Sequence, residues 1–177
     1  SLALFTTGSI QQSNVTDVSA ETIPVGEGFT SELARLNLVY ESPDDNDPVS
    51  MIAKFPSKYR PTRSLLNRLG VYEREVQFYQ KLTAELPLNA PRPYFTVWNN
   101  QSQESLLLLE DLSCLRVVDQ LIGCAQEDAQ LAVNDLARFH ANFWNSAGLA
   151  DMSWAPRWDM GAEIFQTTYP ILWRRLL

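Results

Sequence analysis

A glycine-rich turn is the first feature of the chain that could hold a ligand. Between two predicted strands lie Gly26, Glu27, Gly28, Phe29, Thr30 and Ser31. Because glycine lets backbone N–H groups approach a ligand closely, such a turn can fold over the phosphates of a nucleotide. A dinucleotide-binding fingerprint needs a following helix and a P-loop ends in Gly-Lys-Ser, so neither motif fits. A plain hairpin turn is the other interpretation.

Lys54 is a charged residue in an otherwise apolar stretch, residues 49–55. Strand alternation places it on the side of Ile52, while Met51 and Ala53 face the other way. Both faces are largely apolar, and a lysine buried there is costly unless it is paired or bound to an anion. Alternatively, its ammonium group reaches water at the end of the strand.

Glu75 is the third such residue. It lies three residues after Tyr72 and four before Tyr79, so in a helix it shares their apolar face. A carboxylate on a face that points to the core needs a cation nearby. The alternative is a surface ion pair at the edge of that face.

The elements that must position these residues form an α+β pattern. Alternation of apolar and polar residues predicts five strands, over residues 17–25, 32–41, 49–55, 94–98 and 105–109. Short connections between the first three indicate an antiparallel meander. Helical spacing predicts a helix over residues 71–86, ended by prolines. The basic residues 58–68 are typical of an irregular, solvated loop.

After Asp111 the pattern becomes helical. We expect a short helix over residues 117–124, a long one over 127–145 closed by Gly148, and a last stretch over 160–177. The fold class is therefore a five-stranded antiparallel sheet with one helix, followed by further helices.

Composition narrows the classes of function. The 177 residues are 45% hydrophobic, enough for a core, and the net charge of -7 disfavours nucleic acid as a partner. A single histidine and two cysteines exclude a multi-histidine metal site and a disulfide scaffold. The longest aliphatic run has four leucines and the N-terminus does not resemble a signal peptide, so we expect no membrane association and a cytoplasmic location.

The order of these elements is that of a kinase-like nucleotide-binding lobe, in which a glycine loop, a strand lysine and a helix glutamate act together. Residues 17–144 resemble the aminoglycoside phosphotransferase family, and most closely its choline-kinase-like and ecdysteroid-kinase-like branch. Four segments carry the resemblance: Met51-Ile52-Ala53-Lys54, Tyr72-Glu73-Arg74-Glu75-Val76-Gln77-Phe78-Tyr79, Leu107-Leu108-Leu109-Glu110-Asp111-Leu112 and Leu136-Ala137-Arg138-Phe139-His140-Ala141.

The resemblance implies a protein-kinase-like fold of two lobes, here residues 1–112 and an incomplete helical lobe, residues 113–177. It implies ATP and magnesium as cofactors and a small-molecule hydroxyl as the phosphoryl acceptor. Lys54 would bind phosphates under the glycine turn and pair with Glu75. The backbone of Glu110 and Leu112 would bind adenine, and Asp111 beside them would have a capping or solvent-facing role.

Two departures from the family pattern bear on activity. Ser31 replaces the third glycine of the loop, and no His-Gly-Asp sequence or later Asp-x-Asp sequence occurs. We interpret His140 as a packed core histidine, so this chain has no catalytic and no metal-binding residue; the magnesium ligands would lie beyond Leu177. We therefore expect a fragment of a phosphotransferase that is inactive alone and able to self-associate. The alternative is a non-catalytic kinase-like nucleotide-binding or scaffold module.

Overall fold

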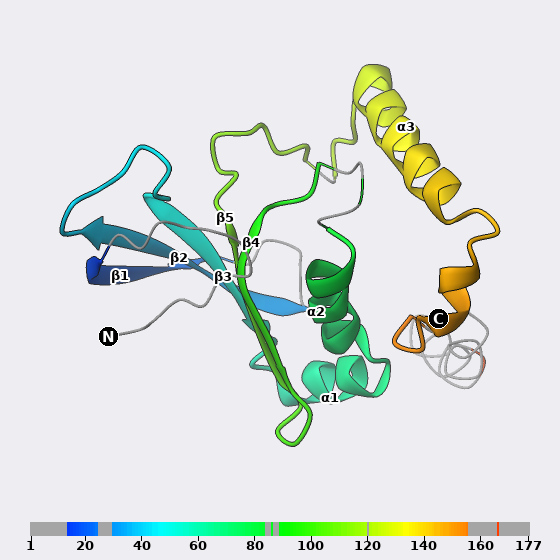
Figure 1. The fold of residues 1–177 in the computed structure, drawn as a ribbon, viewed down its shortest axis with the longest axis horizontal. Coiled ribbons are helices and arrows are strands. Elements are labelled where there is room, and N and C mark those ends of the chain that lie inside the picture. The colour runs from blue at the N-terminus through cyan, green and yellow to red at the C-terminus, as the bar shows by residue number, and fades with distance from the viewer. Residues whose placement is uncertain are drawn as a thin grey trace. The chain divides into compact units, whose positions relative to one another are not determined.

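The computed structural model describes residues 14–24, 30–83, 86, 89–119, 121–155 and 166. The five predicted strands are present, each within a few residues of its expected bounds. They are β1 (Val15–Ile23), β2 (Ser31–Tyr40), β3 (Ser50–Pro56), β4 (Pro93–Asn99) and β5 (Glu104–Glu110). All neighbours are antiparallel, in the order β1-β2-β3-β5-β4, so the predicted meander is confirmed (Figure 1).

The two faces of the sheet have separate apolar clusters. On one face Met51, Ala53 and Leu108 are buried beneath partly buried residues of β2, β4 and β5. On the other, Leu107 and Leu109 pack with Val76 of α2 (Val71–Lys81). The run of four leucines in β5 is apolar throughout because its residues contribute to both clusters.

Helix α1 (Arg60–Arg68) replaces the solvated loop that was expected there, so this prediction is wrong and the sheet is accompanied by two helices before β4 (Figure 1). Pro61 in the first turn does not oppose helix formation, because the N–H groups there have no partner within the helix. Gly70 then adopts a φ of +65°, which lets the chain turn directly into α2. Arg74 secures this corner by donating to the carbonyls of Leu69 (2.5 Å) and Gly70 (3.1 Å).

The helical part of the prediction also needs corrections. Helix α2 ends at Lys81, before the prolines, and Leu86 is buried outside it. No helix forms in the described part of residues 117–124. Helix α3 (Gln126–Phe143) ends before Gly148, so this glycine does not close it. The residue with a left-handed φ after the helix is Asn145, at +53°. The expected stretch over residues 160–177 lies outside the described residues except for Gln166, which is helical.

By compactness the chain divides into two units, Ser1–Trp144 and Asn145–Leu177. The second unit contains a short 3-10 helix, η1 (Ala147–Asp151). The expected boundary between lobes at residues 112 and 113 stays a prediction.

Helix α3 has no buried residue. Its exposed residues include Leu131, Leu136 and His140, and Trp144 just after it is also exposed. The interpretation of His140 as a packed core histidine is therefore wrong. The helix has the amphipathic period of a packed element, but the described part of the chain does not cover its apolar residues.

Candidate functional site

The predicted ion pair between Lys54 and Glu75 is present. Lys54 Nζ lies 2.5 Å from Glu75 Oε1, and each side chain is 27% exposed. Strand alternation turns Lys54 toward α2, and helical spacing turns Glu75 toward the sheet. The pair therefore joins β3 to α2 at a half-buried position that a ligand can still reach.

Strand register extends this face from Lys54 toward the end of β5. Residues opposite each other in neighbouring strands share a face of the sheet. Lys54 lies between Leu33 and Leu107, and Ile52 lies between Arg35 and Leu109. Leu33, Ile52 and Leu109 thus form an apolar strip on the face that carries the lysine.

The last residue of β5 and the segment after it hold the two residues expected to bind adenine. The N–H of Glu110 donates to the carbonyl of Arg92 at 2.8 Å, and Glu110 Oε2 accepts from the N–H of Arg92 at 3.1 Å. The carbonyl of Leu112 accepts from the N–H of Leu115 at 2.9 Å. These bonds fix the segment next to the apolar strip and occupy one backbone group of each residue.

Asp111 forms a second charged contact on the same face. Its Oδ2 accepts from Arg35 Nε at 2.7 Å and from Ser50 Oγ at 2.8 Å, and its Oδ1 accepts from the N–H of Ser113 at 3.0 Å. Only 6% of the Asp111 side chain is exposed. Burial alone raises the pKa of Asp111, but the hydrogen bonds from Ser50, Arg35 and Ser113 outweigh it and lower the pKa to about 2.

The bond from Ser113 closes a local turn, and no helix begins directly after Asp111, so the expected capping role is wrong, as is the solvent-facing one. Sequence reasoning missed the pair with Arg35, which is 76 residues away. A signal was present, because Arg35 occupies an inward position of β2 between Leu33 and Asn37. A charged residue there needs a partner as much as Lys54 does.

Tyr72 connects the glycine-rich segment to α2. It is 2% exposed, its hydroxyl donates to the carbonyl of Thr30 at 2.6 Å, and it accepts from the N–H of Ser57 at 3.1 Å. Thr30 and Ser57 adjoin the paired ends of β2 and β3, where Ser31 lies opposite Pro56. Tyr72 precedes Glu75 by about one helical turn, so α2 contacts both the strand ends and Lys54. Of the other glycine-turn residues, Gly26, Gly28 and Phe29 lie outside the described residues.

Neither a metal site nor a spanning helix occurs in the described ranges. Those ranges contain no group of three or more histidine, cysteine, aspartate or glutamate residues that could hold a metal ion. Cys114 and Cys124 are free and exposed. In the same ranges no helix has the length and apolarity needed to cross a membrane.

Comparison with known proteins bears on most of the first unit. The model of the ecdysteroid kinase-like family matches residues 25–144, which include β2 to β5 and helices α1 to α3. No curated protein and no solved structure gives a significant match to the chain. With its five-stranded antiparallel sheet, its lysine–glutamate pair between β3 and α2, and this match over more than half of its length, the chain belongs to the ecdysteroid kinase-like family, whose members have a kinase-like fold.

Proposed function

We propose that this chain is the nucleotide-binding part of an ATP-dependent phosphotransferase that moves the γ-phosphoryl group to a hydroxyl of a small molecule. The observation that carries the proposal is the Lys54–Glu75 pair. A lysine held by a glutamate from a helix is pre-oriented, so it can bind phosphate oxygens without first losing side-chain entropy. Family membership supports the small-molecule class of acceptor.

The adenine ring would lie against the apolar strip formed by Leu33, Ile52 and Leu109. Its polar edge would meet the carbonyl of Glu110 and the N–H of Leu112, because the other backbone groups of these two residues already have partners. With adenine there, the phosphates extend toward Lys54 on the same face. In the proposal, the glycine turn from Gly26 to Ser31 covers the phosphates.

Magnesium would neutralise the phosphate charge during transfer. The described residues contain no cluster of carboxylates that fits this ion. We propose that the general base and the metal ligands lie beyond Leu177, that the 177 residues alone do not turn over substrate, and that the protein works in the cytoplasm.

Calorimetric titration with ATP tests the nucleotide site. Replacing Lys54 by methionine removes a charge-assisted contact worth about 1.5–3 kcal/mol, so the affinity for ATP falls by roughly 10- to 150-fold. Glu75→Gln lowers it less, because the lysine keeps its charge but loses its orientation. Lys81→Met is the matched control, since Lys81 is an exposed lysine in the last turn of α2. Equal ATP affinity in the Lys54 and Lys81 variants would refute the proposed site.

Transfer is measured separately, on the full-length protein, with ATP, magnesium and a panel of small-molecule alcohols. Phosphorylated product that disappears with Lys54→Met supports the phosphotransferase. ATP binding that depends on Lys54, without phosphorylation of any alcohol, would instead identify the non-catalytic nucleotide-binding module.

A further inference from the structure

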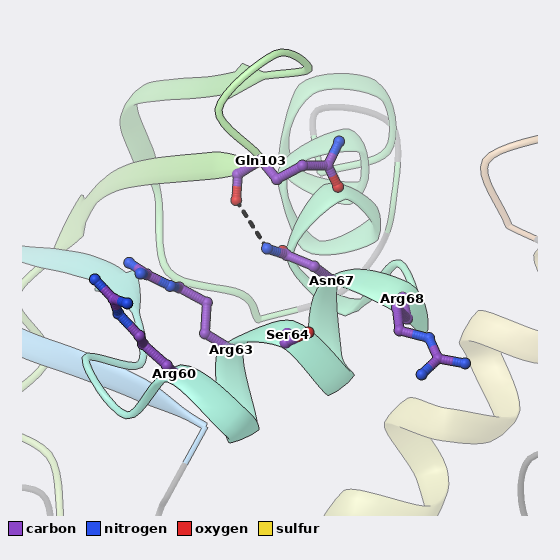
Figure 2. Close-up of a pocket in the computed structure, with 6 residues that line it drawn as sticks. All are labelled: Arg60, Arg63, Ser64, Asn67, Arg68 and Gln103. Atoms are coloured by element: carbon purple, nitrogen blue, oxygen red, sulfur yellow. Dashed lines mark hydrogen bonds between the residues drawn. The ribbon is translucent and has the colours of Figure 1, made fainter.

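An open cavity lined by polar residues lies away from the candidate nucleotide site, between α1 and the turn that joins β4 to β5. Its volume is about 470 Å³, and it is lined by Arg60, Arg63, Ser64, Asn67, Arg68 and Gln103 (Figure 2). None of these residues takes part in the contacts of Lys54, Glu75 or Asp111. A cavity of this size holds a small organic molecule.

The cavity concentrates positive charge on an acidic chain. Helix α1 has three arginines in nine residues and no acidic residue in its first turn, although the chain has a net charge of -7. Arg63 has a distant partner, Glu104 at 3.9 Å. Within the ranges that the structure describes, Arg60 and Arg68 form no ion pair. Arg60 and Arg63 are one helical turn apart and point the same way in Figure 2, so two guanidinium groups can act on one anion.

The opposite wall of the cavity is rigid. Asn67 Nδ2 donates to the carbonyl of Gln103 at 3.1 Å, as Figure 2 shows. Gln103 has a left-handed φ of +57°, and its N–H donates to the carbonyl of Asn99 at 2.8 Å. Its side-chain amide donates to the carbonyl of Asn100 at 3.0 Å. A non-glycine residue held at positive φ costs free energy, and such strain is concentrated at functional sites.

One polar atom in this wall has no partner. Asn67 Oδ1 is buried and accepts no hydrogen bond from any described residue. Because Asn67 Nδ2 is committed to Gln103, the oxygen is oriented as an acceptor. A buried acceptor without a donor is costly, and a ligand hydroxyl would supply the donor.

We propose that this cavity binds a small phosphate ester that carries a free hydroxyl. The phosphate would contact the guanidinium groups of Arg60 and Arg63, whose planar forks match its oxygens, and the hydroxyl would donate to Asn67 Oδ1. The site does not depend on nucleotide binding at Lys54.

Calorimetry with glycerol 3-phosphate and with inorganic phosphate tests this site. The protein binds glycerol 3-phosphate several-fold more tightly than inorganic phosphate, because only the ester carries a hydroxyl. The double variant Arg60→Gln/Arg63→Gln lowers the affinity for glycerol 3-phosphate by at least about tenfold. Arg138→Gln, which changes an exposed arginine of α3 paired with Asp135, leaves the affinity within about twofold, and so does Lys54→Met.

Three results would overturn the proposal: no binding of the ester at about 10 mM, an unchanged affinity in the double variant, or loss of binding in Lys54→Met. The last result would place the ester at the nucleotide site. A second measurement needs no variant. Glycerol 3-phosphate should protect Arg60 and Arg63, but not Arg138, from modification by phenylglyoxal, and equal modification with and without the ester would also contradict the site.

Discussion

Replacing Asp111 by asparagine tests whether the charged contact between β2 and the end of β5 stabilises the sheet. The substitution keeps the shape of the side chain and removes its charge. Asp111 has three hydrogen-bond donors around it, and Arg35 would lose the carboxylate that it contacts at 2.7 Å. The expected result is a lower free energy of unfolding at neutral pH.

The pKa of Asp111 gives the expected size of this loss in the free energy of unfolding. It falls from 3.8 to about 2 in the folded protein. A difference of about 1.8 pKa units corresponds to roughly 2.5 kcal/mol at 1.36 kcal/mol per unit. Because 31% of the Arg35 side chain is exposed and solvent screens the pair, we expect a loss of about 1.5–2 kcal/mol.

The pH dependence has a definite sign. A carboxylate whose pKa is depressed by folding stabilises the protein above its unfolded pKa, and this stabilisation is lost as the pH falls through the folded pKa. The difference between wild type and Asp111→Asn should therefore be constant from about pH 7 to pH 5 and shrink by roughly 1 kcal/mol by about pH 3.

Urea unfolding at several pH values measures this difference. Asp45→Asn, in the exposed turn between β2 and β3, is the matched control and should change stability by less than about 0.5 kcal/mol. A loss below about 0.5 kcal/mol for Asp111→Asn, or a loss that stays the same down to about pH 3, would refute the reasoning.

Two further substitutions test how the site is held. Tyr72→Phe leaves the carbonyl of Thr30 and the N–H of Ser57 without their partner, so urea unfolding should show that the free energy of unfolding falls by about 1–3 kcal/mol. The control Tyr79→Phe, on the same helix, should lower it less, and equal losses would contradict a role for the Tyr72 hydroxyl. Gly70→Ala forces a side chain into a φ of +65° although the new Cβ meets no atom nearer than 3.8 Å, so thermal unfolding should reveal a cost of about 1–2 kcal/mol. Gly148→Ala, where φ is not positive, should cost less, and the same cost at both positions would count against the backbone argument.

The basic charges of residues 58–68 misled the prediction for α1. Pro61 is a helix breaker only in a helix interior, and here it occupies the first turn. Helix α1 has no buried residue, and three of its nine residues are arginines, a composition that is also typical of a solvated loop. At the corner after α1, Arg74 donates to the carbonyls of Leu69 and Gly70, and the N–H of the left-handed Gly70 donates to the carbonyl of Asn67. These contacts join residues three to five positions apart, but they follow no hydrophobic period that a sequence pattern could reveal.

Patterns in the sequence were enough to predict the five strands, the antiparallel meander of the first three, helix α2 and, together with the resemblance to a kinase-like lobe, the Lys54–Glu75 pair. These depend on local periods of two and 3.6 residues, and on the cost of leaving a single charge on an apolar face. Two contacts are seen only in the folded chain: Arg35 pairs with Asp111, and Tyr72 joins Thr30 to Ser57. These contacts require the register of β2, β3 and β5 and the placement of α2 on the sheet, which bring together residues up to 76 positions apart. The exposure of His140 was decided in the same way, because helical period shows which residues share a face but not whether another element covers it.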